Sequence, residues 1–289
     1  MSTTNVFITG ANRALTPVVS QPPPKSINTR TGVGHALVQT YLARPNHIVI
    51  GSVRDIAAAR SNGLEDLSAA PGSRLVLVKI ESVSFVDPTR AVSELESWGI
   101  TRLDIVIANA AIAGGKVAAA AEGDAEDFAN ILAINAVALL APFAATKPLL
   151  DRATTHKWVS ISSAAASLAK HEAIFINMGG RPMGFGYGAS KATLNHLSLN
   201  IHSENPKLTV TAVDPGFLDT EMGTRGAKLF GMEKPPHSTV DNANAIVKLV
   251  SGLRDEISET FGIDKELDRC CNKRDSGKFS TFDGDEVSW

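Results

Sequence analysis

The chain has 289 residues, of which 44% are hydrophobic and 20% charged, and its formal net charge is −2 at pH 7. Because lysines and arginines are spread along the chain, the sequence excludes the basic footprint of a nucleic-acid-binding protein. The two cysteines, Cys270 and Cys271, are adjacent, and the seven histidines show no ligand spacing. We therefore expect neither a disulfide framework nor a metal site.

The sequence also gives an expectation about membranes. No charged and apolar leader opens the chain, and the most apolar stretch, 131–145, contains Asn135 and Pro142. A membrane-spanning helix needs about 20 apolar residues. We therefore interpret this stretch as a buried helix and expect a cytoplasmic protein with no membrane partner.

Short apolar runs alternate with helical stretches along the chain. The first run, 5–9, enters a glycine turn, and a helix with an apolar face follows Gly32 and ends before Pro45. Further strand-like runs lie at 47–53, 74–80, 103–108, 157–161, 208–213 and 277–282. Such alternation indicates βαβ units, so we predict one doubly wound α/β domain over residues 1–289 with a mostly parallel, seven-stranded sheet.

Two glycine-containing pieces follow the first run. Thr9-Gly10-Ala11-Asn12-Arg13 ends it, and Gly32-Val33-Gly34 opens the next helix. Joined, the two pieces read TGxxxGxG. Glycines let a backbone approach a pyrophosphate closely, and a helix N-terminus supplies N–H groups and a dipole to hold it.

The 18 residues 14–31 separate these pieces. They include Pro17 and three consecutive prolines, 22–24, and show neither helical nor strand periodicity. We interpret them as an insertion, either an extruded loop or an unremoved sequence segment. A second candidate insertion is 261–275, because its removal gives a compact lead into the last strand.

The segment Tyr187-Gly-Ala-Ser-Lys191 is the one most indicative of chemistry. Residues four apart share a helix face, and a nearby ammonium favours the phenolate of a tyrosine whose pKa is ordinarily about 10. Such a phenol can protonate a carbonyl oxygen. An ordinary surface helix gives the same spacing, so the segment does not decide the function alone.

Four other motifs accompany it in a fixed order. They are 103–111, which ends in Asn109-Ala110-Ala111; Asn135 in a helical stretch; Ser160-Ile-Ser162-Ser163 at a strand end; and Asp214-Pro215-Gly216, followed by Thr220. Each has a structural alternative, such as a turn former or a satisfied helix amide. Together they make the chain resemble the short-chain dehydrogenase/reductase family over nearly its whole length apart from the insertion.

The resemblance implies a Rossmann fold and hydride transfer from a nicotinamide to a ketone or aldehyde. In the catalytic set that it implies, Tyr187 gives the proton, Ser163 orients the carbonyl, Lys191 holds the nicotinamide ribose and acidifies Tyr187, and Asn135 anchors a water in the proton relay. The cofactor contacts that it implies are Gly10, Arg13, Gly32, Val33, Gly34, Glu81, Asn109, Lys191, Pro215, Gly216 and Thr220.

Cofactor choice follows from charge at the end of the second strand. An NAD site of this kind uses an acidic residue there, whereas an NADP site uses a cation for the 2′-phosphate. The strand ends at Val53 and is followed by Arg54, and Asp55 is expected to cap a helix. We therefore predict NADP(H), with Arg54 as a phosphate ligand.

The substrate is expected to be a small carbonyl compound or alcohol. Segments 164–186 and 217–240 would form a pocket wall and lid, unless their apolar residues are an ordinary core under loops. Those residues are Phe175, Met183, Phe185, Phe217, Met222 and Phe230. Residues 227–231 and 276–284 resemble fungal norsolorinic acid ketoreductase-like members of the family, which reduce polyketide-type ketones in secondary metabolism. We expect a homo-oligomer.

Two functions remain open at this point. One is an NADPH-dependent carbonyl reductase. The other is a dinucleotide-binding or vestigial, non-catalytic protein, because the glycine-rich turn is interrupted.

We predict that deleting 14–31 leaves folding intact and strengthens NADPH binding by roughly tenfold or more. The entropic cost of closing a loop depends weakly on its length, so the fold should tolerate the segment. The phosphate-binding turn, in contrast, must keep its glycines close together. Calorimetric titration of both proteins tests this. A deletion variant that binds no better, or does not fold, would show that the segment is an integral part of the protein.

Overall fold

The computed structural model describes residues 3–12, 32–115, 117–181, 184–253 and 276–289. Both predicted insertions, 14–31 and 261–275, lie outside the described residues, as do Arg13 and Met183.

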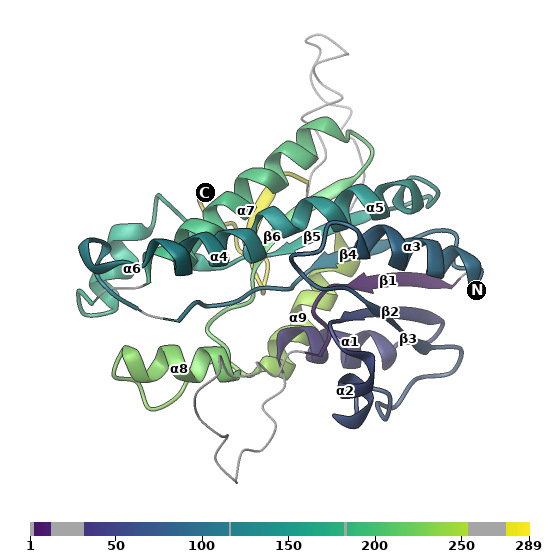
Figure 1. Cartoon of the computed structure of the whole chain (residues 1–289), viewed down its shortest axis with the longest axis horizontal. Coiled ribbons are helices and arrows are strands. Elements are labelled where there is room, and N and C mark those ends of the chain that lie inside the picture. The colour runs from purple at the N-terminus through teal and green to yellow at the C-terminus, as the bar shows by residue number, and fades with distance from the viewer. Residues whose placement is uncertain (1–2, 13–31, 116, 182–183, 254–275) are drawn as a thin grey trace.

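A parallel sheet forms the centre of the chain (Figure 1). Its seven strands lie in the order β3-β2-β1-β4-β5-β6-β7, and each registered pair is parallel. The strands are β1 (Thr4–Ile8), β2 (His47–Val53), β3 (Arg74–Lys79), β4 (Ile105–Ala108), β5 (Lys157–Ile161), β6 (Thr209–Asp214) and β7 (Lys278–Thr281). The predicted fold class is confirmed. The strand order reverses between β1 and β4, which is where ligands bind in such sheets.

Helices cover both faces of the sheet (Figure 1). On one face lie α1 (Val33–Leu42), α2 (Ile56–Ser61) and α9 (Thr239–Gly252). The other face carries α3 (Asp87–Ser97), α4 (Ala125–Asn135), α5 (Leu140–Leu150) and α7 (Phe185–Glu204). Two shorter helices, α6 (His171–Asn177) and α8 (Glu221–Leu229), lie at the left of the view.

Side-chain periodicity explains how the helices attach to the sheet. The predicted apolar face of α1 is buried as expected and packs on β1, β2 and α9; it consists of Ala36, Leu37, Val38, Tyr41 and Leu42. On the opposite face, Trp158 of β5 is fully buried and meets Phe143 of α5 edge-on at 5.1 Å between ring centroids. Burial of this apolar surface is the main force holding the layers together.

The expectation of one buried helix over 131–145 is wrong. Helix α4 ends at Asn135, a short 3₁₀ turn follows at Val137–Leu139, and α5 begins at Leu140. Val137 and Leu140 are 39% and 45% exposed. Among the described residues, Ala125–Leu150 is also the one helical stretch long and apolar enough to cross a membrane by length and composition alone, with 28% of its most apolar window buried.

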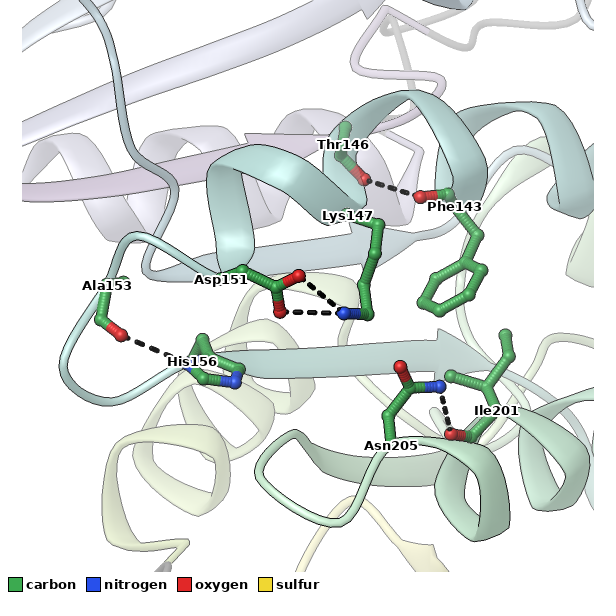
Figure 2. Close-up of polar contacts among 8 residues, drawn as sticks. All are labelled: Phe143, Thr146, Lys147, Asp151, Ala153, His156, Ile201 and Asn205. Atoms are coloured by element: carbon green, nitrogen blue, oxygen red, sulfur yellow. Dashed lines mark hydrogen bonds and ion pairs between the residues drawn. The ribbon is translucent and has the colours of Figure 1, made fainter.

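Polar groups at the amino edge of the sheet pair with each other (Figure 2). The Lys147 ammonium contacts both carboxylate oxygens of Asp151 at 2.7 and 2.6 Å as α5 ends. The His156 Nδ1 atom lies 3.1 Å from the Ala153 carbonyl oxygen just before β5, and Asn205 donates to the Ile201 carbonyl at 2.7 Å as α7 ends. These groups close helix ends and turns, so the ionisable residues at this edge serve the fold.

Candidate active site

Two cavities, each of about 360 Å³, open near the carboxyl ends of the strands. Their size is within the range of small-molecule sites. The first cavity lies between the ends of β1, β2 and β3, and Gly10, Asn12, Ser52, Arg54 and Glu81 are on its wall. The second cavity lies between α1, the ends of β5 and β6, and helices α6, α7 and α8; Gly34, Asn109, Ser163, Tyr187, Lys191 and Gly216 are on its wall.

The two glycine pieces meet between these cavities. Gly10 follows β1 with a φ of +66°, a conformation that favours glycine. A Cβ atom at Gly34 would lie 2.3 Å from the Gly10 carbonyl oxygen and 2.6 Å from the Asn109 amide nitrogen. Gly32 is the N-cap of α1 in extended conformation, and Val33 and Gly34 line the second cavity with it. Both parts of TGxxxGxG therefore reach one place, whereas Arg13 lies outside the described residues.

Asn109 ties the end of β4 to this glycine contact. Its backbone N–H donates to Thr9 Oγ1 at 2.9 Å, and its amide donates to the carbonyl oxygens of Thr9 at 2.9 Å and Gly10 at 3.3 Å. Thr9 is a functional residue that the sequence reasoning did not single out. A hydroxyl at the end of a strand can accept hydrogen bonds from backbone N–H groups of the neighbouring strand. In the sequence, the indication of this role is the position of Thr9 directly before the glycine turn.

The first cavity carries a cation beside β2. Arg54 is exposed on its wall, directly after the last residue of β2. Asp55 Oδ1 accepts from the Ala58 N–H at 3.0 Å and caps α2, as predicted. Glu81 also lines this cavity, and its side chain accepts from the Ser82 N–H at 3.0 Å.

Asn135, which lines the first cavity, connects three elements. Its side chain exchanges two hydrogen bonds with the Ile112 backbone, accepting at 2.7 Å and donating at 2.8 Å. Its amide also donates to Ser190 Oγ at 3.0 Å, and Ser190 donates to the Tyr187 carbonyl oxygen at 2.7 Å. The end of α4 thus fixes both the loop after β4 and the first turns of α7. Sequence reasoning missed Ser190, although its position three residues after Tyr187 places it on the same helix face.

Ser163, Tyr187 and Lys191 line the second cavity together. The Ser163 hydroxyl lies close enough to the Tyr187 phenol to lower the pKa of that phenol. The Lys191 side chain is 1% exposed, and its ammonium donates to the Ile161 carbonyl oxygen at 2.7 Å and lies 5.9 Å from the Tyr187 ring centroid. A buried ammonium needs such partners to offset its desolvation.

The expectation that Lys191 makes Tyr187 more acidic is wrong for this structure. Burial, followed by the negative charge of Asp214, raises the pKa of Tyr187 to about 12, and the hydrogen bond from Ser163 offsets part of that rise. The Lys191 ammonium donates a hydrogen bond to the Ile161 carbonyl oxygen at the end of β5. The phenol therefore keeps its proton at neutral pH, which is the form that an acid requires.

The turn after β6 shapes the remaining wall of the second cavity. Gly216 has a φ of +82°, and Asn242 of α9 donates to the Pro215 carbonyl oxygen at 2.8 Å. Thr220 lines the cavity but also caps α8, accepting from the Gly223 N–H at 3.0 Å. Sequence reasoning gave no role to Asp214, whose Oδ1 accepts from the Gly216 N–H at 3.1 Å and whose pKa is raised by burial.

Apolar side chains form the outer wall of the second cavity. Phe217, Met222 and Phe230 line it as expected, whereas Phe175 is 37% exposed and does not. Met183 and the side chain of Phe185 lie outside the described parts. Three lining residues were not foreseen: Ile174, Met178 and Leu229.

The raised pKa of Tyr187 can be measured directly. The chain has two tyrosines, and the Tyr41 hydroxyl is buried with no hydrogen-bond partner among the described residues, so Tyr41→Phe should leave the fold intact and Tyr187 as the single phenol. Its phenolate absorbance in the folded protein should appear near pH 12 rather than at about 10. Adding Asp214→Asn should move the midpoint down, because a negative neighbour is removed.

This shift also has a consequence for stability. Between about pH 10 and the folded-state pKa, the folded protein holds a proton that the unfolded chain has lost, so the free energy of unfolding should fall as the pH rises through that window. A midpoint at or below pH 10 in folded Tyr41→Phe protein would contradict the effect of burial.

Comparisons with known proteins agree with this geometry. Residues 28–228 match the family described as short chain dehydrogenase. The chain is 37% identical over 262 residues to the short-chain dehydrogenase srdF of Neurospora crassa, covering 89% of this chain and 94% of that protein. It is 34% identical over 260 residues to the norsolorinic acid ketoreductase stcE of Emericella nidulans, covering 89% and 90%.

Solved structures show the same fold. The NADPH-bound carbonyl reductase from chicken fatty liver superposes with a TM-score of 0.70 at 21% identity, over 100% of this chain and 95% of that one. The carbonyl reductase Sniffer of D. melanogaster superposes with a TM-score of 0.72 at 18% identity, over 99% and 100%.

Proposed function

Because the chain belongs to the short-chain dehydrogenase/reductase family, and is an oxidoreductase of its fungal norsolorinic acid ketoreductase-like type, we propose that it reduces a ketone or aldehyde to an alcohol with NADPH. The observation that carries this proposal is the convergence of Ser163, Tyr187 and Lys191 on one cavity, with the Ser163 hydroxyl near enough to the Tyr187 phenol to lower its pKa. A protonated phenol beside a second hydroxyl is a donor pair suited to a carbonyl oxygen.

The described residues fit a nicotinamide dinucleotide. The N-terminus of α1 borders the second cavity, and Gly32 and Gly34, which have no side chains, lie on its wall. A reduced nicotinamide, when bound, supplies the hydride. Pro215, Gly216 and Thr220 would hold the nicotinamide end, Asn109 would lie beside the glycine contact, and Glu81 would lie at the adenine end.

The protein's own part is alignment and proton transfer. Ser163 would orient the carbonyl oxygen, and Tyr187 would give its phenolic proton to that oxygen as the carbonyl carbon becomes tetrahedral. Lys191 would hold the ribose hydroxyls from its buried position, and Asn135 would keep the loop and helix around them in register.

The preference for NADPH rests on the first cavity. Arg54 is the cation on the wall directly after β2, and the neighbouring Asp55 is engaged as the cap of α2. A guanidinium binds a phosphate through charge-assisted hydrogen bonds. The names of two solved structures with this fold mention bound NADPH or NADP and the name of a third mentions NAD, so the choice rests on Arg54.

The proposed substrate class rests on the proteins that this chain resembles and on the residues that line the second cavity. Norsolorinic acid ketoreductases are among the relatives, and the outer wall is apolar, so we propose a polyketide or other aromatic ketone. The contact of Gly10 with Gly34 favours this enzyme over a non-catalytic protein, because both halves of the interrupted turn reach the site.

We further propose one cytoplasmic domain that assembles with copies of itself. The exposed Val137 and Leu140 support the assembly, because they present apolar surface beside the break between α4 and α5.

Tyr187→Phe should lower kcat for ketone reduction by at least about 100-fold while leaving NADPH affinity largely unchanged, because only the proton donor is lost. Tyr41→Phe is the matched control, since it makes the same change in the core. Turnover close to that of the unmutated protein in Tyr187→Phe would contradict the role of Tyr187.

Arg54→Ala should weaken NADPH binding by roughly tenfold and NADH binding much less, because a charge-assisted phosphate contact disappears. Arg60→Ala provides the control, because Arg60 is an exposed arginine of α2 that pairs with Glu65. Fluorescence titration of both cofactors measures the effect. Equal affinity of the unmutated protein for NADPH and NADH would end the argument for NADP specificity.

A further inference from the structure

Asp214 places a carboxyl group on the wall of the reaction site. It is the last residue of β6 and lines the same cavity as Ser163 and Tyr187. The pairing of β5 with β6 sets Val213 opposite Ile161, so Asp214 ends β6 beside the residues that lead from β5 to Ser163. Its negative charge acts on the Tyr187 phenol. The carboxyl group therefore lines the same cavity as the hydroxyls that would bind the carbonyl oxygen.

Backbone groups hold this carboxyl group in place. The Gly216 N–H donates to Oδ1 at 3.1 Å, and the nearby Ala164 N–H lowers the pKa of the carboxyl group in part. A carboxylate offers about four acceptor positions, so the bond from Gly216 leaves acceptor capacity on a group that lines the cavity. His237 and Lys170 act on it through their charge. When a substrate binds and removes water from such an acceptor, the loss of that hydrogen bond costs free energy unless the substrate supplies a donor in its place.

The turn itself does not require an acid. Asparagine and aspartate both form the local turn in which a side-chain oxygen accepts from the N–H two residues later, as Asp214 does with Gly216. An amide would do so without burying a charge, and without raising the pKa of the Tyr187 phenol. A role toward a ligand accounts for a carboxylate at this position.

We propose that Asp214 accepts a hydrogen bond from a hydroxyl group of the substrate that lies close to the reacting carbonyl. The substrate class is therefore a ketone with a neighbouring hydroxyl, such as an ortho-hydroxyaryl ketone. This inference rests on the proposed ketone reduction and narrows it. The proposed role of Asp214 also separates the polar part of the cavity wall, around Ser163 and Tyr187, from the apolar part. Phe217, Met222 and Phe230 belong to the apolar part.

Two isomeric ketones test the proposal. With 2′-hydroxyacetophenone the hydroxyl lies beside the carbonyl, and with 4′-hydroxyacetophenone the same group lies across the ring. The ratio of their kcat/KM values, measured with NADPH in the unmutated protein and in Asp214→Asn, cancels the intrinsic reactivities. Asp214→Asn keeps the oxygen that the turn needs and replaces the remaining acceptor with an N–H donor. Asp66→Asn, at an exposed position away from both cavities, controls for loss of one charge.

The expected result is that Asp214→Asn lowers the ortho-to-para ratio by roughly ten- to a hundredfold, the effect of one hydrogen bond to a charged group, while Asp66→Asn leaves it unchanged. An unchanged ratio in Asp214→Asn overturns the proposal. The proposal is also overturned if Asp214→Asn lowers kcat/KM equally for both isomers, because Asp214 would then act on the turn. A loss of NADPH affinity of the same size overturns it as well, because Asp214 would then act on the cofactor.

Substrate variation in the unmutated protein gives a second readout that does not depend on the folding of the variant. Replacing 2′-hydroxyacetophenone by 2′-methoxyacetophenone removes the donor and should lower kcat/KM by at least about tenfold. Equal efficiency overturns the role of Asp214. A protein that reduces none of these ketones with NADPH contradicts the proposed function itself, which is a different outcome from reduction without preference.

Discussion

The site depends on one close backbone contact, between the carbonyl of Gly10 and the backbone of Gly34. The two residues meet so closely that a single added carbon at Gly34 would lie 2.3 Å from the Gly10 oxygen. This contact sets the N-terminus of α1 against the end of β1, where the strand order of the sheet reverses. A helix N-terminus at this point is suited to a pyrophosphate. Because Gly10 lines the first cavity and Gly34 lines the second, the contact lies between the two cavities that a dinucleotide would occupy.

The segment after β4 links the glycine contact to the residues around Tyr187. Asn109 binds Thr9 and Gly10 on one side, and Ile112 binds Asn135 on the other. From Asn135 the hydrogen bonds continue through Ser190 to the backbone of Tyr187. Tyr187 is therefore connected to the glycine contact through the segment after β4 by a series of hydrogen bonds that are partly or fully buried. Such pre-organisation is how a protein aligns a cofactor with its substrate.

Much of this arrangement was predictable because the signals are local. Apolar runs mark the seven strands, and the face of α1 follows helical periodicity, so both appear in the sequence. Ser163 and Tyr187 were predictable because they stand at element ends in a fixed order. The end of α4 at Asn135 depends on partners far along the chain, and the raised pKa of Tyr187 depends on burial and on Asp214. Such long-range effects leave no pattern in a short window of sequence.

Calorimetric titration of the intact chain with NADPH tests the central role of the glycine contact most directly. The account predicts one NADPH bound per chain, and a loss of at least about tenfold in affinity for Gly34→Ala, because the added methyl group collides with the Gly10 carbonyl. Gly252→Ala is the control, since a Cβ there has no atom within 4 Å. Circular dichroism would establish that both variants fold. The account is contradicted if the intact chain binds no NADPH, or if folded Gly34→Ala binds it as tightly as the unmutated protein.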